Sequence, residues 1–126
     1  MTKGMKELVA EAKGRVREVD VQTAKAERDA EPRTLVLDVR EGEEVAQGRV
    51  PGALHVPRGV LEAKAAPDSP AREEAFEDLE RPILVYCGSG VRSAFAADTL
   101  QTLGFTRVAS VDGGFSAWKE AGLPVE

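Results

Sequence analysis

The chain has 126 residues, of which 42% are hydrophobic, 31% are charged and 5% are aromatic. This length is typical of one domain, and the hydrophobic share is large enough to form a core, which argues against wholesale disorder. Lys and Arg total 17 against 22 for Asp and Glu, so the net charge is −5. A net negative chain with few aromatic residues lacks the basic surface of a nucleic-acid binder, and we expect no nucleic-acid partner.

Nothing in the hydropathy pattern predicts a membrane segment. The longest apolar run, Ile83–Cys87, is far shorter than a membrane span. Lys3, Lys6 and Glu7 interrupt the region where a signal peptide would need a continuous apolar stretch. We therefore expect a cytoplasmic protein with no membrane association.

The first predicted element is an amphipathic helix, because apolar residues recur at helical spacing over residues 5–12 and Gly14 follows as a terminator. From about residue 16 onward, short apolar segments alternate with helical ones. In chain order we expect an apolar segment at 16–21, a helix at 22–29, a strand at 35–39, helical turns at 41–47, a strand at 53–56, two short helical stripes within 59–79, a strand at 83–86, a loop at 87–92, a helix capped by Ser93, a strand at 107–111 and a helix at 115–120.

Strands that alternate with helices predict βαβ units. The expected architecture is a three-layer α/β/α fold, in which helices cover both faces of a central, mainly parallel sheet of about five strands. We expect residues 1–126 to form a single domain, with residues 1–14 as an appended N-terminal helix.

The chain contains one cysteine, Cys87, and one histidine, His55. One thiol cannot form an internal disulfide, and these two residues cannot make a zinc site from Cys and His alone, so we expect no metal. Cys87 is therefore either a small buried apolar residue or a reactive thiol.

The surroundings of Cys87 favour a reactive thiol. Cys87 follows the most apolar strand and precedes a helix, which is where open α/β sheets bind ligands. Gly88 and Gly90 allow a tight turn that aims several N–H groups at one point, and Arg92 adds a cation in a loop without acidic residues. The start of the next helix adds free N–H groups, and all these features favour the thiolate.

These residues also carry a family resemblance. The segment YCGSGVRSAFAADTLQTLGF resembles the active-site segment of single-domain rhodaneses, a Cys-x-x-Gly-x-Arg-Ser loop followed by its helix. LVLDVREGEE resembles the first core strand of that family, GRVPGALHVP resembles its Gly-His-Ile-Pro-Gly-Ala segment, and VDGGFSAW resembles its terminal Gly-Gly…Trp element. Together these motifs cover residues of about 34–126, in the order of the family.

The resemblance implies a rhodanese-like fold and a sulfurtransferase that needs no cofactor. Cys87 would be the nucleophile that takes a sulfane sulfur from a small anionic donor, thiosulfate or 3-mercaptopyruvate, and carries it as a persulfide to cyanide or a thiol acceptor. The anion-binding loop would be formed by the backbone amides of Gly88, Ser89, Gly90, Val91, Arg92 and Ser93. Because the chain has no second cysteine, the acceptor must come from outside, and a sulfur-acceptor protein is one expected partner.

Some residues depart from the family or have secondary roles. Arg49 stands where the family usually has His, in a turn that we expect to have no part in the chemistry. The CGSGV sequence resembles mercaptopyruvate sulfurtransferases, which have Thr in place of Arg92, so the donor stays open. We expect Asp38 to orient the active-site loop and Arg40 to pair with Glu43 or Glu44.

Three other functions are compatible with parts of the sequence. Cysteine phosphatases and arsenate reductases of related fold have five residues between Cys and Arg, whereas four separate Cys87 from Arg92. A non-catalytic regulatory module would not need the cysteine, and a persulfide carrier bound to a partner protein lies between module and enzyme. We expect His55 to be structural rather than a general base, and Arg58 to be solvated rather than donor-binding.

Overall fold

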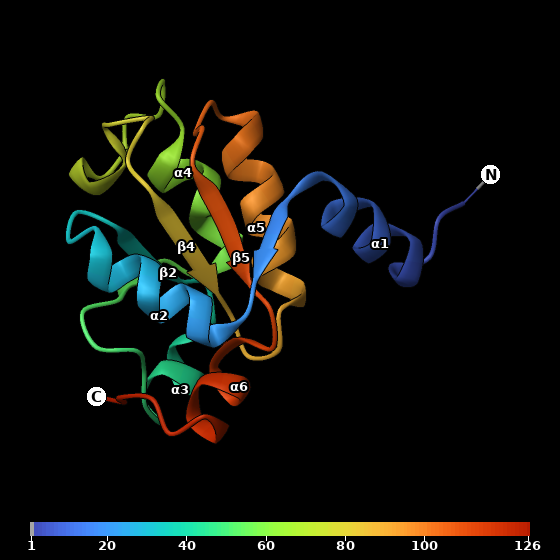
Figure 1. Ribbon diagram of the computed structural model, residues 1–126. Coiled ribbons are helices and arrows are strands. Elements are labelled where there is room, and N and C mark those ends of the chain that lie inside the picture. Colours follow the sequence, from blue (N-terminus) through green and yellow to red (C-terminus); the bar gives the residue numbers. More distant parts are fainter. Residues whose placement is uncertain (1) are drawn as a thin grey trace.

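The apolar runs of the sequence become the strands of one parallel sheet. The computed structural model describes residues 2–126 and is shown in Figure 1. Within those residues, the sheet has five strands in the order β1-β5-β4-β2-β3, and all neighbouring strands are parallel. The strands are β1 Arg17–Val19, β2 Leu35–Asp38, β3 Leu54–His55, β4 Ile83–Tyr86 and β5 Val108–Val111. The predicted α/β class and the sheet of about five strands are confirmed.

Helices connect the strands, as βαβ units require. They are α1 Met5–Arg15, α2 Val21–Ala30, α3 Gly42–Val45, α4 Leu61–Ala65, α5 Val91–Thr102 and α6 Gly114–Glu120, with 3₁₀ turns η1 Arg58–Val60 and η2 Glu74–Phe76. No helix among residues 2–126 is long and apolar enough to cross a membrane.

Two helix boundaries differ from the sequence prediction. Gly14 lies inside α1 rather than ending it; its φ is not positive, and the helix stops when Val16 becomes extended. Ser93 does not cap α5, because Gly90, with a φ of 110°, takes the position before the first helical residue. Glycine adopts this left-handed conformation at little cost, so α5 begins three residues earlier than expected. Ser93 then lies in the first turn of the helix.

Helical layers bury both faces of the central strands β2, β4 and β5, which explains why these strands are mainly apolar. Side chains alternate along a strand, so Leu37 and Val85 pack on the face covered by α4 and α5. Val36 and Leu84 face the other side, with α2 and Trp118 of α6. Figure 1 shows α2 crossing the sheet on one side and α5 on the other.

Helix α1 lies at the end of the sheet where β1 forms the edge, and it packs against α5 (Figure 1). The Arg15 guanidinium binds the Asp98 carboxylate at 2.8 Å, and the Gln101 amide donates to the Arg15 carbonyl at 2.9 Å. Ala12 is buried, whereas Met5 and Leu8 are exposed.

The arrangement of β2 and β4 positions the site. These strands are adjacent and parallel in the middle of the sheet, with Asp38 opposite Tyr86. Their carboxyl ends therefore bring together the turn after β2 and the loop that begins at Cys87.

Candidate active site

Cys87 is buried at the carboxyl end of β4, beneath the start of α5. Its Sγ accepts hydrogen bonds from the Gly90 amide at 3.1 Å and the Ser93 amide at 3.4 Å, and it lies 3.6 Å from the Ser93 hydroxyl oxygen. Burial raises the pKa of the thiol, but hydrogen bonds from the Ser93 hydroxyl and from the amides of Ser93, Gly90 and Ser89 outweigh it. The pKa of Cys87 is therefore below its ordinary value, which favours the nucleophilic thiolate.

A chain of two buried hydroxyls supports the sulfur. The Ser110 hydroxyl, on β5, donates to Ser93 Oγ at 2.8 Å, and both side chains are completely buried. When Ser110 donates in this way, the proton of the Ser93 hydroxyl is free to point at a Cys87 thiolate. The sequence does not predict a role for Ser110. The only indication of one is that a polar residue stands inside an apolar strand.

Helix α6 holds the first two carbonyls of the loop. The Phe115 amide donates to the Cys87 carbonyl at 2.8 Å, and the Ser116 amide donates to the Gly88 carbonyl at 3.2 Å. The C=O and N–H of a trans peptide point in opposite directions. Anchoring the Gly88 carbonyl therefore directs the Ser89 N–H away from α6, toward the sulfur.

Gly114 permits this close approach. Its φ is +54°, and a Cβ built on it would lie 2.4 Å from the Cys87 carbonyl oxygen. No side chain fits there, so the second glycine of the terminal Gly-Gly pair is required by the loop that it supports. In the sequence this pair is visible only as part of the Gly-Gly…Trp element, which does not indicate a place in the site.

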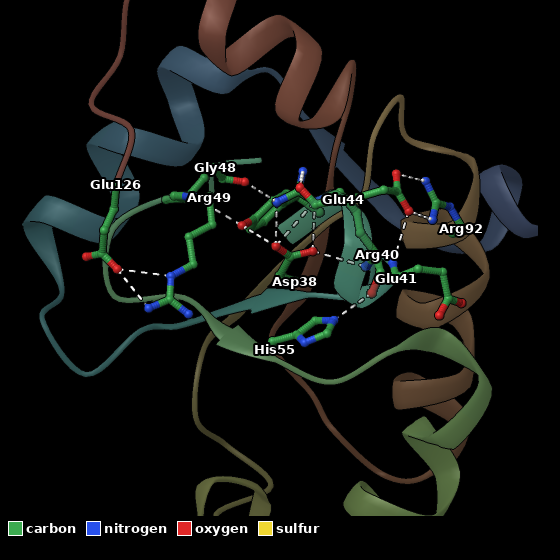
Figure 2. Close-up of polar contacts among 11 residues, drawn as sticks. Asp38, Arg40, Glu41, Glu44, Gly48, Arg49, His55, Arg92 and Glu126 are labelled. Carbon is green, nitrogen blue, oxygen red and sulfur yellow. Dashed lines mark hydrogen bonds and ion pairs between the residues drawn. The ribbon is translucent and has the colours of Figure 1, made fainter. Parts of the chain in front are cut away.

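Arg92 is not the unpaired cation that the sequence suggested. Its guanidinium makes two bonds to the Glu44 carboxylate, Nη1 to Oε1 at 2.6 Å and Nη2 to Oε2 at 2.9 Å (Figure 2). Hydrogen bonding by Arg92 lowers the pKa of Glu44 to about 2. The loop itself has no acidic residue, but α3 supplies one, which the local sequence around Cys87 does not reveal.

Asp38 and Arg40 form a buried ion pair at the end of β2, shown in Figure 2. Arg40 Nη2 lies 2.8 Å from Asp38 Oδ2, and the Tyr86 hydroxyl donates to the same oxygen at 2.7 Å. The predicted pairing of Arg40 with the carboxylate of Glu43 or Glu44 is wrong: Arg40 binds Asp38 and reaches only the backbone carbonyl of Glu44. Burial against Tyr86 keeps the guanidinium inside, beside the nearest buried carboxylate.

Asp38 thus contacts the residue before Cys87 rather than the loop itself. The Tyr86 hydroxyl also accepts from the Val50 amide at 3.1 Å, and burial raises its pKa above the usual value. The network fixes the end of β4, from which the loop starts. The orientation of the loop by Asp38 stays a prediction.

The remaining candidate residues have other partners. His55 Nε2 lies 2.7 Å from the Arg40 carbonyl oxygen, Arg58 binds Glu62 and the Thr99 hydroxyl, and Arg49 pairs with Glu126. Arg58 is therefore neither free in solvent nor directed at the sulfur.

Within the Cys87 loop, each residue has a distinct place. Gly88 lies against the Arg92–Glu44 pair, Ser89 is exposed, and Val91 is half-buried in the first turn of α5. Among residues 2–126, no group of three or more His, Cys, Asp or Glu side chains is arranged to hold a metal ion.

A known protein family matches most of this chain. The model of the rhodanese-like domain matches residues 20–121. The chain belongs to the rhodanese-like family. This rhodanese-like chain is 32% identical over 110 residues to a sulfurtransferase of Allochromatium vinosum, covering 87% of the chain and 94% of the relative. It is 40% identical over 93 residues to thiosulfate sulfurtransferase 16, a chloroplastic protein of Arabidopsis thaliana, covering 71% and 78%.

A solved structure agrees with this assignment of the fold. The rhodanese-like chain superposes on a Rhodopseudomonas palustris protein of unknown function, described as a possible tyrosine phosphatase, with a TM-score of 0.93. The two are 34% identical, and the match covers 100% of this chain and 96% of the other. The proteins similar to this chain thus include relatives named sulfurtransferases and a solved structure described as a possible tyrosine phosphatase.

Proposed function

We propose that the protein is a rhodanese-type sulfurtransferase that carries sulfane sulfur as a persulfide on Cys87. The observation that carries the proposal is the cradle of hydrogen bonds around Cys87 Sγ, given by the Gly90 and Ser93 amides and the Ser93 hydroxyl. A cradle that stabilises a thiolate also suits the terminal anionic sulfur of a persulfide, because fixed donors act strongly in a buried site. Relatives named sulfurtransferases support the same reaction.

With thiosulfate, the first step is attack by the Cys87 thiolate on the outer sulfur of the donor. A new S–S bond forms to Cys87, the S–S bond of thiosulfate breaks, and sulfite leaves with the electron pair. With 3-mercaptopyruvate, the C–S bond breaks instead, and the electron pair stays on carbon as the pyruvate enolate, which takes up the proton of the donor thiol. Both donors leave Cys87 as a persulfide anion.

The second step transfers the sulfur to the acceptor and regenerates the free enzyme. Cyanide attacks the outer sulfur of the persulfide, a C–S bond forms, and the electrons of the broken S–S bond restore the Cys87 thiolate. A thiolate acceptor attacks in the same way and leaves as a persulfide. Since Cys87 is the one cysteine in the chain, no internal thiol competes with the acceptor.

The site favours sulfur transfer over phosphate-ester hydrolysis. The charge of Arg92, the cation that would bind the phosphate oxygens in a phosphatase, is shared here with the Glu44 carboxylate. Only four residues separate Cys87 from Arg92, which leaves a narrower loop. Hydrolysis of an aryl phosphate is the control reaction for this alternative.

The test measures steady-state thiocyanate formation from cyanide with thiosulfate and with 3-mercaptopyruvate. The wild type is expected to turn over with at least one donor, and Cys87→Ser with neither. Equal turnover by Cys87→Ser would overturn the proposal. Hydrolysis of the aryl phosphate without any sulfur transfer would favour the phosphatase, and sulfur loading without turnover would favour a persulfide carrier.

A further inference from the structure

The Arg92–Glu44 pair lies against Gly88, the residue that follows Cys87. A Cβ built on Gly88, the residue after Cys87, would lie 3.2 Å from Arg92 Nη2 and 3.6 Å from Glu44 Oε2. Both charged side chains are 37% exposed, so they border solvent beside the loop that holds Cys87. The pair therefore lies on the solvent side of the loop, which we take as the entrance to the cradle.

Glu44 is held in place from its own helix as well. Its Oε1 accepts from the Glu41 amide at 3.0 Å, in a reciprocal capping box at the start of α3 (Figure 2). The two bonds to Arg92 then reach an oxygen pair that is already oriented, in the parallel geometry that binds a guanidinium best. Glu44 thus restrains Arg92, and a donor anion competes with this carboxylate for the positive charge of the guanidinium.

The pair has more effect on charge than on stability. Exposed and half-exposed ion pairs contribute little to folding, since solvent screens them. With Glu44 ionised, the positive charge of Arg92 is cancelled at the entrance, and the Glu41 carboxylate adds further negative potential near Arg92. A doubly charged donor therefore gains little electrostatic attraction from Arg92. A singly charged donor, which depends less on that attraction, loses less affinity through the neutralisation.

We propose that Glu44 is a specificity-determining residue, which neutralises Arg92 and so sets the preference of Cys87 toward sulfur donors of low negative charge. The inference rests on the proposed sulfur transfer and deepens it. It explains how a loop with an arginine beside its cysteine can avoid being a strong site for dianions, and it assigns the discrimination to α3, outside the loop.

The test compares two sulfane donors that differ by one charge, thiosulfate, a dianion, and methanethiosulfonate, a monoanion, with cyanide as acceptor. The measured quantity is the ratio of kcat/KM for thiosulfate to kcat/KM for methanethiosulfonate. Glu44→Gln is expected to raise this ratio about tenfold at low salt, the size expected for one added charge acting a few ångströms from the extra charge of the dianion. The increase should shrink at high salt, because salt screens exposed charges.

Two further variants keep the result interpretable. Glu43→Gln removes the same charge from α3, but its side chain is exposed and Arg92 pairs with Glu44 instead, so the ratio should stay at the wild-type value. The double variant Glu44→Gln/Arg92→Gln removes both charges and should return the ratio to near the wild-type value.

The outcomes separate this inference from the function on which it rests. An equal ratio in Glu44→Gln and Glu43→Gln would overturn the role of Glu44, and so would an equal loss of activity with both donors, which would show that Glu44 only supports the loop. If the wild type transferred sulfur from neither donor, the proposed function itself would fail.

Discussion

Gly114→Ala tests the idea that α6 supports the active-site loop by close contact. The added methyl group would lie 2.4 Å from the Cys87 carbonyl oxygen and 2.8 Å from the Gly88 carbonyl carbon, well inside van der Waals contact. Both neighbours are backbone atoms, so they cannot rotate away. Either α6 or the loop must move, and the bonds from the Phe115 and Ser116 amides must lengthen.

The expected cost has two parts. A left-handed φ of +54° disfavours alanine over glycine by about 1–2 kcal/mol. Displacement of packed atoms adds about 1–3 kcal/mol. We therefore expect Gly114→Ala to lower the free energy of unfolding by about 2–5 kcal/mol, and to lower Tm by roughly 10 °C or more in a domain of this size.

Gly122→Ala is the matched control. Gly122 has a φ of +74°, but a Cβ on it would meet nothing within 4 Å, so this variant carries the backbone cost without the contact. Thermal unfolding of both variants isolates the contact with the loop. If Gly114→Ala unfolded at the same temperature as Gly122→Ala, the proposed support of the loop by α6 would be refuted.

Two more predictions concern the Cys87 thiolate and the buried Asp38–Arg40 ion pair. Hydrogen bonds hold the pKa of Cys87 below its ordinary value. The rate of alkylation by iodoacetamide should therefore rise with pH and reach its plateau at a lower pH than for a free thiol. Ser93→Ala should move this profile upward by about one pH unit, since a hydrogen bond to a charged group contributes about 1.5 kcal/mol or more; an unmoved profile would count against the cradle. Asp38→Asn leaves the buried Arg40 guanidinium without a charged partner and should destabilise the fold by about 3–5 kcal/mol in denaturant unfolding. Wild-type stability of that variant would show that the pair is dispensable.

The fold was largely predictable because burial on both faces of a parallel sheet leaves a strong local signal. The runs that become β2 and β4 are mainly apolar, and Gly and Pro residues in the flanking segments mark their ends. Helix ends were less predictable. Gly14 and Ser93 both match boundary preferences, yet neither acts as a boundary. The φ of Gly14 is not positive, and Gly90, which lies against the backbone of residues 111–113, takes the position before α5.

The site was predictable where its parts are contiguous in the chain. The position of Cys87 after a buried strand and the glycines around it are visible in seven consecutive residues. Contacts across the fold were not visible: Glu44 and Arg92 are 48 positions apart in the sequence, and Ser93 and Ser110 are 17 positions apart. The ion pair of Arg40 was predicted with the wrong carboxylate because the pattern favours near neighbours on a helix, whereas burial selects Asp38.

The most direct test of the account is the intact mass of the protein after incubation with a sulfane donor and removal of the excess. The wild type is predicted to gain the mass of one sulfur atom and to lose it when cyanide is added, with thiocyanate released in equal amount. Cys87→Ser is predicted to gain none. An unmodified wild type, or the same gain in Cys87→Ser, would contradict sulfur transfer through Cys87.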